Sequence, residues 1–148
     1  EKTTKNLDVF KISAQLYGTN QLVANTEKVS YNPPETDSFK FRGSTLHWDI
    51  DFNVGLRYHI QGLAYLNDVP ANRGAFSLVP GYHNKIKDLL KTYEPVAAIN
   101  VIKETEEIIS LAGKKGDLIL WLESIPHAAT PNNSNLPRFV QYFSFSRM

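Results

Sequence analysis

Cysteine is absent from this sequence of 148 residues. Without a thiol, the chain can form no disulfide, no thiolate metal site and no cysteine nucleophile. This composition fits a reducing compartment, so we expect an intracellular domain, with the cytoplasm as the first assumption. The segment Ser146-Arg147-Met148 resembles a peroxisomal address, which makes the peroxisome the alternative location.

Long apolar runs and an excess of either charge are also missing. No stretch approaches the roughly 20 apolar residues of a membrane span, so no membrane partner is expected. Sixteen basic and fifteen acidic side chains leave a net charge of +1, and the basic ones are dispersed. A dispersed pattern offers no stripe for a phosphate backbone, which argues against nucleic acid as a partner. A small molecule is therefore the expected ligand.

The pattern of apolar residues and turn signals predicts a single domain that is mainly β. Short strands are separated by turns rich in glycine, proline and asparagine, as in an antiparallel sandwich or barrel. A helix is predicted at 7–16 and a surface helix at 82–93, while 94–112 reads as mixed. Strands are predicted at 29–31, 56–69, 75–79, 107–111, 118–122, 126–129 and 138–146. We divide the domain into a helical lead-in, 1–28, and a β core, 29–148.

The stretch 46–52 contains the first candidate for chemistry, His47 followed two residues later by Asp49. In an extended segment these two side chains point to the same face, so both can reach one ion. Two histidines and a carboxylate form the triad that holds non-heme Fe(II) and leaves positions open. Asp51 competes for the carboxylate role. Three other histidines compete for the third ligand position: His59, His83 and His127.

His127 stands out because Arg138 follows it after a loop rich in proline and asparagine. A loop of that length can return the chain antiparallel, which would bring Arg138 beside His127. An arginine there offers a planar fork to a carboxylate within reach of the metal. On the strand predicted at 56–69, alternation predicts that Gln61 points into a cavity near that carboxylate. Its neighbours Tyr58 and His59, with Trp48, are further candidates for the lining.

Together these residues resemble the phytanoyl-CoA dioxygenase family, whose members are Fe(II)- and 2-oxoglutarate-dependent oxygenases. The resemblance runs from about Val29 to Phe145. It is carried by His47-Trp48-Asp49, Leu66-Asn67-Asp68-Val69, Asn72-Arg73-Gly74, Val79-Pro80-Gly81-Tyr82-His83, Gly116-Asp117, His127, Pro131, Asn132, Ser134, Pro137 and Arg138.

The resemblance implies a double-stranded β-helix, a jelly-roll or cupin-like core with a few flanking helices. It implies His47, Asp49 and His127 as the ligands of Fe(II), and Arg138 as the partner of the distal carboxylate of 2-oxoglutarate. O2 is the third cofactor. His83 falls in a turn signature and is assigned to structure. Two departures are visible: Ala129 replaces a hydroxyl residue found in some relatives, and a longer amino-terminal helical region is missing, so we expect the core part of a longer chain.

The resemblance further implies oxidation of a small-molecule substrate, with release of succinate and CO2. Hydroxylation is expected over halogenation because Asp49 keeps a carboxylate where a halide would bind. Two alternatives remain at this point. One is a non-oxidative, metal-dependent cupin-like enzyme such as an isomerase, which Arg138 disfavours. The other is a binding module that has lost its activity, which the intact triad disfavours.

Overall fold

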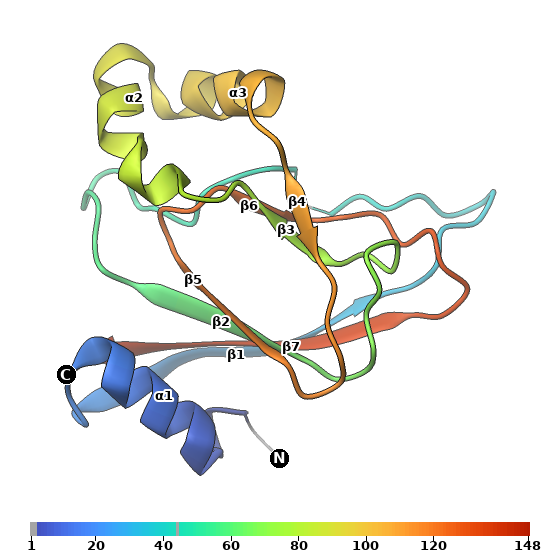
Figure 1. Ribbon diagram of the computed structural model, residues 1–148, viewed down its shortest axis with the longest axis horizontal. Coiled ribbons are helices and arrows are strands. Elements are labelled where there is room, and N and C mark those ends of the chain that lie inside the picture. The colour runs from blue at the N-terminus through green and yellow to red at the C-terminus, as the bar shows by residue number, and fades with distance from the viewer. Residues whose placement is uncertain (1–2, 44) are drawn as a thin grey trace.

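Two antiparallel β-sheets face each other in this computed structural model, which describes residues 3–43 and 45–148 (Figure 1). The larger sheet has the strand order β1-β7-β2-β5 and the smaller the order β4-β3-β6. The larger is built from β1 (Leu22–Asn32), β2 (Ile60–Tyr65), β5 (Leu118–Leu122) and β7 (Arg138–Arg147). The smaller is built from β3 (Phe76–Leu78), β4 (Ile109–Leu111) and β6 (His127–Ala129). The predicted double-stranded β-helix is confirmed.

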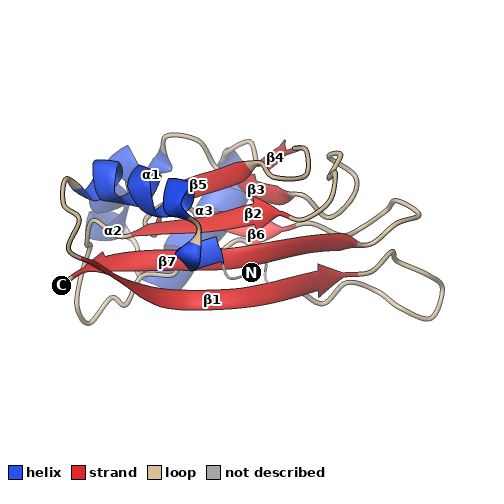
Figure 2. Ribbon diagram, turned by 90° about the horizontal axis from the view of Figure 1, so that it is seen from below, coloured by secondary structure: helices blue, strands red, loops and turns tan. Residues whose placement is uncertain are grey.

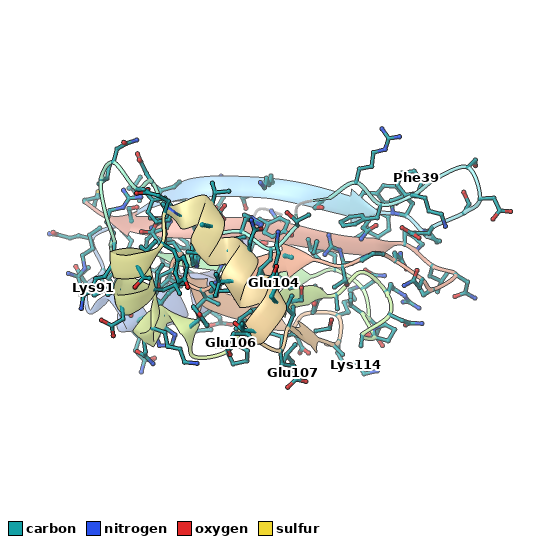
Figure 3. All side chains as sticks on the ribbon, turned by 90° about the horizontal axis from the view of Figure 1, so that it is seen from above. Phe39, Lys91, Glu104, Glu106, Glu107 and Lys114 are labelled. Atoms are coloured by element: carbon teal, nitrogen blue, oxygen red, sulfur yellow. The ribbon has the colours of Figure 1, made fainter. Side chains whose placement is uncertain are left out.

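Helices cover the outside of both sheets (Figure 1). After a 3-10 turn, η1 (Thr3–Lys5), helix α1 (Leu7–Tyr17) lies on the outer face of the larger sheet (Figure 2). The turn η2 (Tyr82–Asn84), α2 (Ile86–Thr92) and α3 (Pro95–Thr105) follow β3. Seen from above, α2 and α3 cover the smaller sheet and carry charged side chains such as Lys91 and Glu104 on their exposed surface (Figure 3). In the described part of the chain, no helix combines the length and apolar character needed to cross a membrane.

Alternation along β7 divides the interior into two layers. On one face Phe143 and Phe145 pack against Val9 and Tyr17 of α1. On the other face Val140 joins the core between the two sheets. That core contains Leu63, Tyr65, Val69, Ala75, Phe76, Trp121 and Val140. Since α1 buries one face of the larger sheet, the opposite face is available to line a site.

Helix α1 matches the prediction closely because its end signals are explicit in the sequence. Asn6 caps it by accepting hydrogen bonds from the backbone N–H groups of Asp8 and Val9. Gly18, at φ +67°, ends it in the left-handed conformation. Helix α1 lies within the lead-in expected over 1–28, and β1 begins at Leu22, before the start of the β core expected at residue 29.

Between residues 56 and 112, two predicted elements differ in extent from the structure and one segment contains a helix that was not predicted. The strand expected at 56–69 is confined to Ile60–Tyr65, because the N–H of Arg57 donates to the side chain of Glu123 and not to a strand. The helix expected at 82–93 is split into η2 and α2. The segment called mixed contains α3, which starts with Pro95 in its first turn and buries Ala98 and Ile102.

Candidate metal and cosubstrate site

An antiparallel bridge between His47 and His127 sets the geometry of the site. The backbone N–H of each residue donates to the carbonyl oxygen of the other at 3.0 Å. The two imidazole rings therefore stand on the same side, with their centroids 4.5 Å apart. This short stretch of pairing brings two distant parts of the chain together at the cavity.

Apolar neighbours hold both histidines in this orientation. Leu46 is buried and Trp48 packs beside it, in a cluster that includes Ile102 of α3. Because side chains alternate along an extended segment, His47 and Asp49 share the face opposite to Leu46 and Trp48. Ala128 joins the same cluster from β6, which directs its neighbour His127 into the cavity.

Hydrogen bonds define which nitrogen of each ring is available. Nδ1 of His47 lies 2.8 Å from the carbonyl oxygen of Thr45. Nδ1 of His127 lies 2.9 Å from the carbonyl oxygen of Ile125. A carbonyl can only accept, so each Nδ1 carries a proton and each Nε2 faces Asp49. Nε2 can donate to the carboxylate while it carries a proton, and it offers a lone pair to a metal once that proton is lost.

Asp49 completes a cluster of three donor atoms that lie within 4.8 Å of one another. Its Oδ1 is 3.6 Å from Nε2 of His47, and its Oδ2 is 3.4 Å from Nε2 of His127. The hydrogen bond with His127 is the main reason why the pKa of Asp49 lies well below its usual range. The amide of Gln61, which donates to Oδ2 at 2.8 Å, acts in the same direction. Two imidazoles and a carboxylate on one face fit a first-row divalent metal with coordination positions left open.

The three donors open into a cavity of about 650 Å³ between the sheets. Aromatic side chains form one wall. Phe76 stacks on His127 with ring centroids 5.5 Å apart, and Trp121 lies 4.4 Å from Phe76. The cavity volume is in the range of small-molecule sites. Its aromatic wall and its polar donor cluster give the cavity the mixed apolar and polar lining that is typical of such sites.

Arg138, at the start of β7, lines the same cavity and is 2% exposed. Its Nη1 donates to the carbonyl oxygen of Gly74 at 2.8 Å, and its Nη2 contacts Oγ of Ser30 at 3.4 Å. Its Nε has no hydrogen-bond partner within residues 3–43 and 45–148, and Arg138 takes part in no ion pair there. A buried cation without a counter-charge costs free energy. The cavity therefore contains a guanidinium suited to receive an anion.

Gly74 makes this arrangement possible. Its φ of +62° is in the left-handed region, and a Cβ at this position would lie 2.3 Å from Nδ2 of Asn32. Only glycine lets the backbone approach Asn32 and still present its carbonyl oxygen to Arg138. This explains physically the glycine of the Asn72-Arg73-Gly74 motif.

The structure brings together most of the residues that the sequence singled out. His47, Asp49 and His127 form one cluster, and Gln61 and Arg138 line the cavity beside it. Their roles as metal ligands and as cosubstrate contacts stay predictions. The competing residues Asp51, His59 and His83 lie outside this cluster.

Asp51 accepts a hydrogen bond from the N–H of Asn53 in a turn, outside the donor cluster. His59 lines a separate small pocket, and His83 belongs to the turn η2. Trp48, Tyr58 and His59 were expected as possible cavity lining, and this was wrong. Trp48 packs under the helices, and Tyr58 is 57% exposed, with its hydroxyl donating to the carbonyl oxygen of Leu16.

Sequence reasoning missed the contribution of β1 and β5 to the cavity. Lys28, Ser30 and Asn32 of β1 line it, as does Trp121 of β5. The signal in β1 was present, because polar residues at every second position suggest a strand with a polar inner face. It was overlooked because only 29–31 had been assigned to the strand.

The sequence matches the family model for phytanoyl-CoA dioxygenase over residues 17–140. The chain belongs to the phytanoyl-CoA dioxygenase family. Enzymes of this family use Fe(II), 2-oxoglutarate and O2, in agreement with a His-Asp-His cluster beside a buried arginine. A search of curated proteins found no match.

Solved structures share the fold at low sequence identity. AviO1 from Streptomyces viridochromogenes Tue57 is 20% identical with a TM-score of 0.74, covering 96% of this chain and 58% of AviO1. SnoK, a non-heme alpha ketoglutarate dependent carbocyclase from nogalamycin biosynthesis, is 19% identical with a TM-score of 0.73, covering 94% and 55%. EctD from S. alaskensis with bound Fe is 17% identical with a TM-score of 0.72, covering 97% and 51%. The chain thus spans little more than half the length of these proteins.

Proposed function

We propose that this chain is the catalytic core of an Fe(II)- and 2-oxoglutarate-dependent oxygenase that hydroxylates a small molecule. One observation carries the proposal: the His-Asp-His cluster and the buried Arg138 without a counter-charge line the same cavity. Stability does not explain Arg138, since a buried cation without a counter-charge costs free energy. A dianion would supply that counter-charge, and a metal would use the three donors of the cluster.

Each residue then has a distinct task. His47, Asp49 and His127 would hold the iron, and Gln61 would keep the Asp49 carboxylate in place through its amide. When bound, the iron, 2-oxoglutarate and O2 would supply the oxidation of a substrate C–H bond, with release of succinate and CO2. Arg138 would hold the distal carboxylate of 2-oxoglutarate through its free Nε and its fork of donors. The wall of Phe76 and Trp121 would exclude water from the reacting groups.

Two buried atoms support the fit of these groups. Besides Nε of Arg138, Oε1 of Gln61 has no hydrogen-bond partner among the residues that the structure describes. Both residues line the cavity, so a bound cosubstrate or its water could satisfy them. EctD, of the same fold, has been solved with 2-oxoglutarate and 5-hydroxyectoine, so the fold can bind this cosubstrate.

Hydroxylation is the finer part of the proposal. It is supported by Asp49, whose carboxylate stands where a halogenase would need room for a halide. SnoK is described as a carbocyclase, so product analysis has to distinguish an added oxygen from a new ring bond. A non-oxidative isomerase would need no site for a dianion, and Arg138 therefore argues against it.

Succinate release tests the proposal. The Fe(II)-loaded protein is incubated with 2-oxoglutarate, O2 and a panel of small molecules, and succinate is quantified with product mass. We expect succinate in wild type, none in Asp49→Ala, and a product heavier by one oxygen atom for a substrate. An isomerised product of unchanged mass without succinate would contradict the proposal.

A further inference from the structure

Lys28 is a second cation on the wall of the same cavity. It pairs with Tyr142 in the register of β1 and β7, two pairs before Ser30 and Val140 and four residues before Asn32 and Arg138. Side chains at these alternate positions share the inner face, and Lys28, Ser30 and Asn32 all line the cavity. Strand β1 is the edge of the larger sheet, so Lys28 stands where the cavity meets solvent.

Aromatic rings connect Lys28 to the donor cluster. Its Nζ lies 5.4 Å from the centre of the Tyr142 ring, within the range of a cation–π interaction. Tyr142 meets Trp121 edge-on, with centroids 6.4 Å apart, and Trp121 lies 5.3 Å from His127. A molecule resting on Tyr142 and Trp121 would therefore have one end near the donor cluster and the other beneath Lys28.

Lys28 has no acidic partner on this wall. In the described segments, no ion pair includes it. Glu27, its neighbour in β1, faces the other side of the sheet, where its carboxylate accepts hydrogen bonds from Thr4 and Gln141. If the proposed function holds, the charges of Fe(II), Asp49, 2-oxoglutarate and Arg138 cancel, and the charge of Lys28 stays uncompensated.

Lys28 lies too far from Arg138 for both residues to bind the same carboxylate. Four residues of strand lie between the two register pairs, which corresponds to about 13 Å along the sheet. A dianion with one carboxylate on Arg138 already has that end satisfied, and the opposite end is directed to the donor cluster. Lys28 is thus free for a different molecule that enters over the sheet edge.

From these contacts we propose that Lys28 selects the substrate, which carries an anionic group on an apolar body. The anion, a carboxylate, sulfonate or phosphate ester, pairs with Nζ of Lys28. The apolar body lies against Tyr142 and Trp121 and brings a C–H bond to the metal. This inference rests on the proposed function and specifies the class of its substrate.

A matched pair of probes tests the inference by binding alone. Isothermal titration of 3-phenylpropionate and of 3-phenylpropionamide is carried out in the anaerobic Fe(II) protein saturated with 2-oxoglutarate. We expect wild type to prefer the carboxylate by about tenfold, as for one charge-assisted contact. Lys28→Met should bind both probes equally, and Lys28→Arg should keep the preference. Lys11→Met, on the exposed face of α1, is the control and should match wild type.

Two outcomes would overturn the inference. One is equal affinity of wild type for the two probes. The other is a loss of 2-oxoglutarate affinity in Lys28→Met as large as that in Arg138→Ala, which would make Lys28 part of the cosubstrate site. If wild type binds no 2-oxoglutarate at all, the proposed function fails instead. The two probes are then compared without 2-oxoglutarate. A preference for the carboxylate that Lys28→Met removes still supports an anion site at Lys28, and equal affinity for the two probes rejects that site.

Discussion

The side-chain amide of Gln61 donates to Oδ2 of Asp49 at 2.8 Å, so a residue of β2 fixes the carboxylate that follows His47. Residues that orient metal ligands in this way typically change metal affinity by about 10- to 100-fold when they are removed. We expect Gln61→Leu to lower Fe(II) affinity by about tenfold, because the carboxylate loses its orienting donor. Competition with a metal indicator measures this, and an unchanged affinity would reduce Gln61 to cavity lining.

Asp49 and Asp51 offer a test of ligand identity with a built-in control. Asp49→Ala should abolish Fe(II) binding and leave the protein folded, because the side chain is 42% exposed and adds little to the core. Asp51→Ala removes only a turn hydrogen bond to Asn53 and should leave metal affinity unchanged. If Asp51→Ala alone abolished metal binding, the carboxylate ligand would have been assigned to the wrong residue.

Gly74 and Gly81 form a pair that separates backbone strain from close packing. Both have positive φ, +62° and +74°, but a Cβ at Gly81 would meet no atom within 4 Å, whereas one at Gly74 would meet Asn32 at 2.3 Å. Gly81→Ala should cost about 1–2 kcal/mol of unfolding free energy, which is the price of the left-handed conformation alone. Gly74→Ala should cost more and should also weaken 2-oxoglutarate binding, since the carbonyl bonded to Arg138 is displaced. Urea unfolding with cosubstrate titration measures both; equal effects of the two variants would contradict the packing argument.

The inner face of β7 can be read from the sequence because its alternation is strict. Tyr142 and Ser144 line the cavity, and Phe143 and Phe145 pack against α1, as alternation requires. The His-Asp motif was equally readable, because buried Leu46 and Ile50 bracket it in an extended segment. These are local patterns, and local patterns are what a sequence states directly.

Tertiary contacts decided the remaining features. Strand β1 was underestimated because most of its residues are polar, as is possible at a sheet edge, where even Val23 and Val29 are exposed. The role of Gly74 depends on Asn32 and Arg138, which meet it only in the folded chain. Tyr58 and Gln61 were both expected on the strand 56–69. Strand β2 begins only at Ile60, so Tyr58 lies outside the sheet and its side chain is exposed.

Arg138 separates an oxygenase from a protein that merely binds metal, and titration of 2-oxoglutarate into the anaerobic Fe(II) protein tests its role most directly. In Arg138→Ala the affinity should fall by roughly 2–4 kcal/mol, because a buried charge-assisted pair is lost and a carboxylate stays unpaired. Arg138→Lys should recover only part of this, since a point charge cannot replace two parallel hydrogen bonds. Fe(II) affinity should stay unchanged in both variants, because the three donor residues are intact. Equal affinity of wild type and Arg138→Ala for 2-oxoglutarate would contradict the assignment of this cavity to an oxygenase.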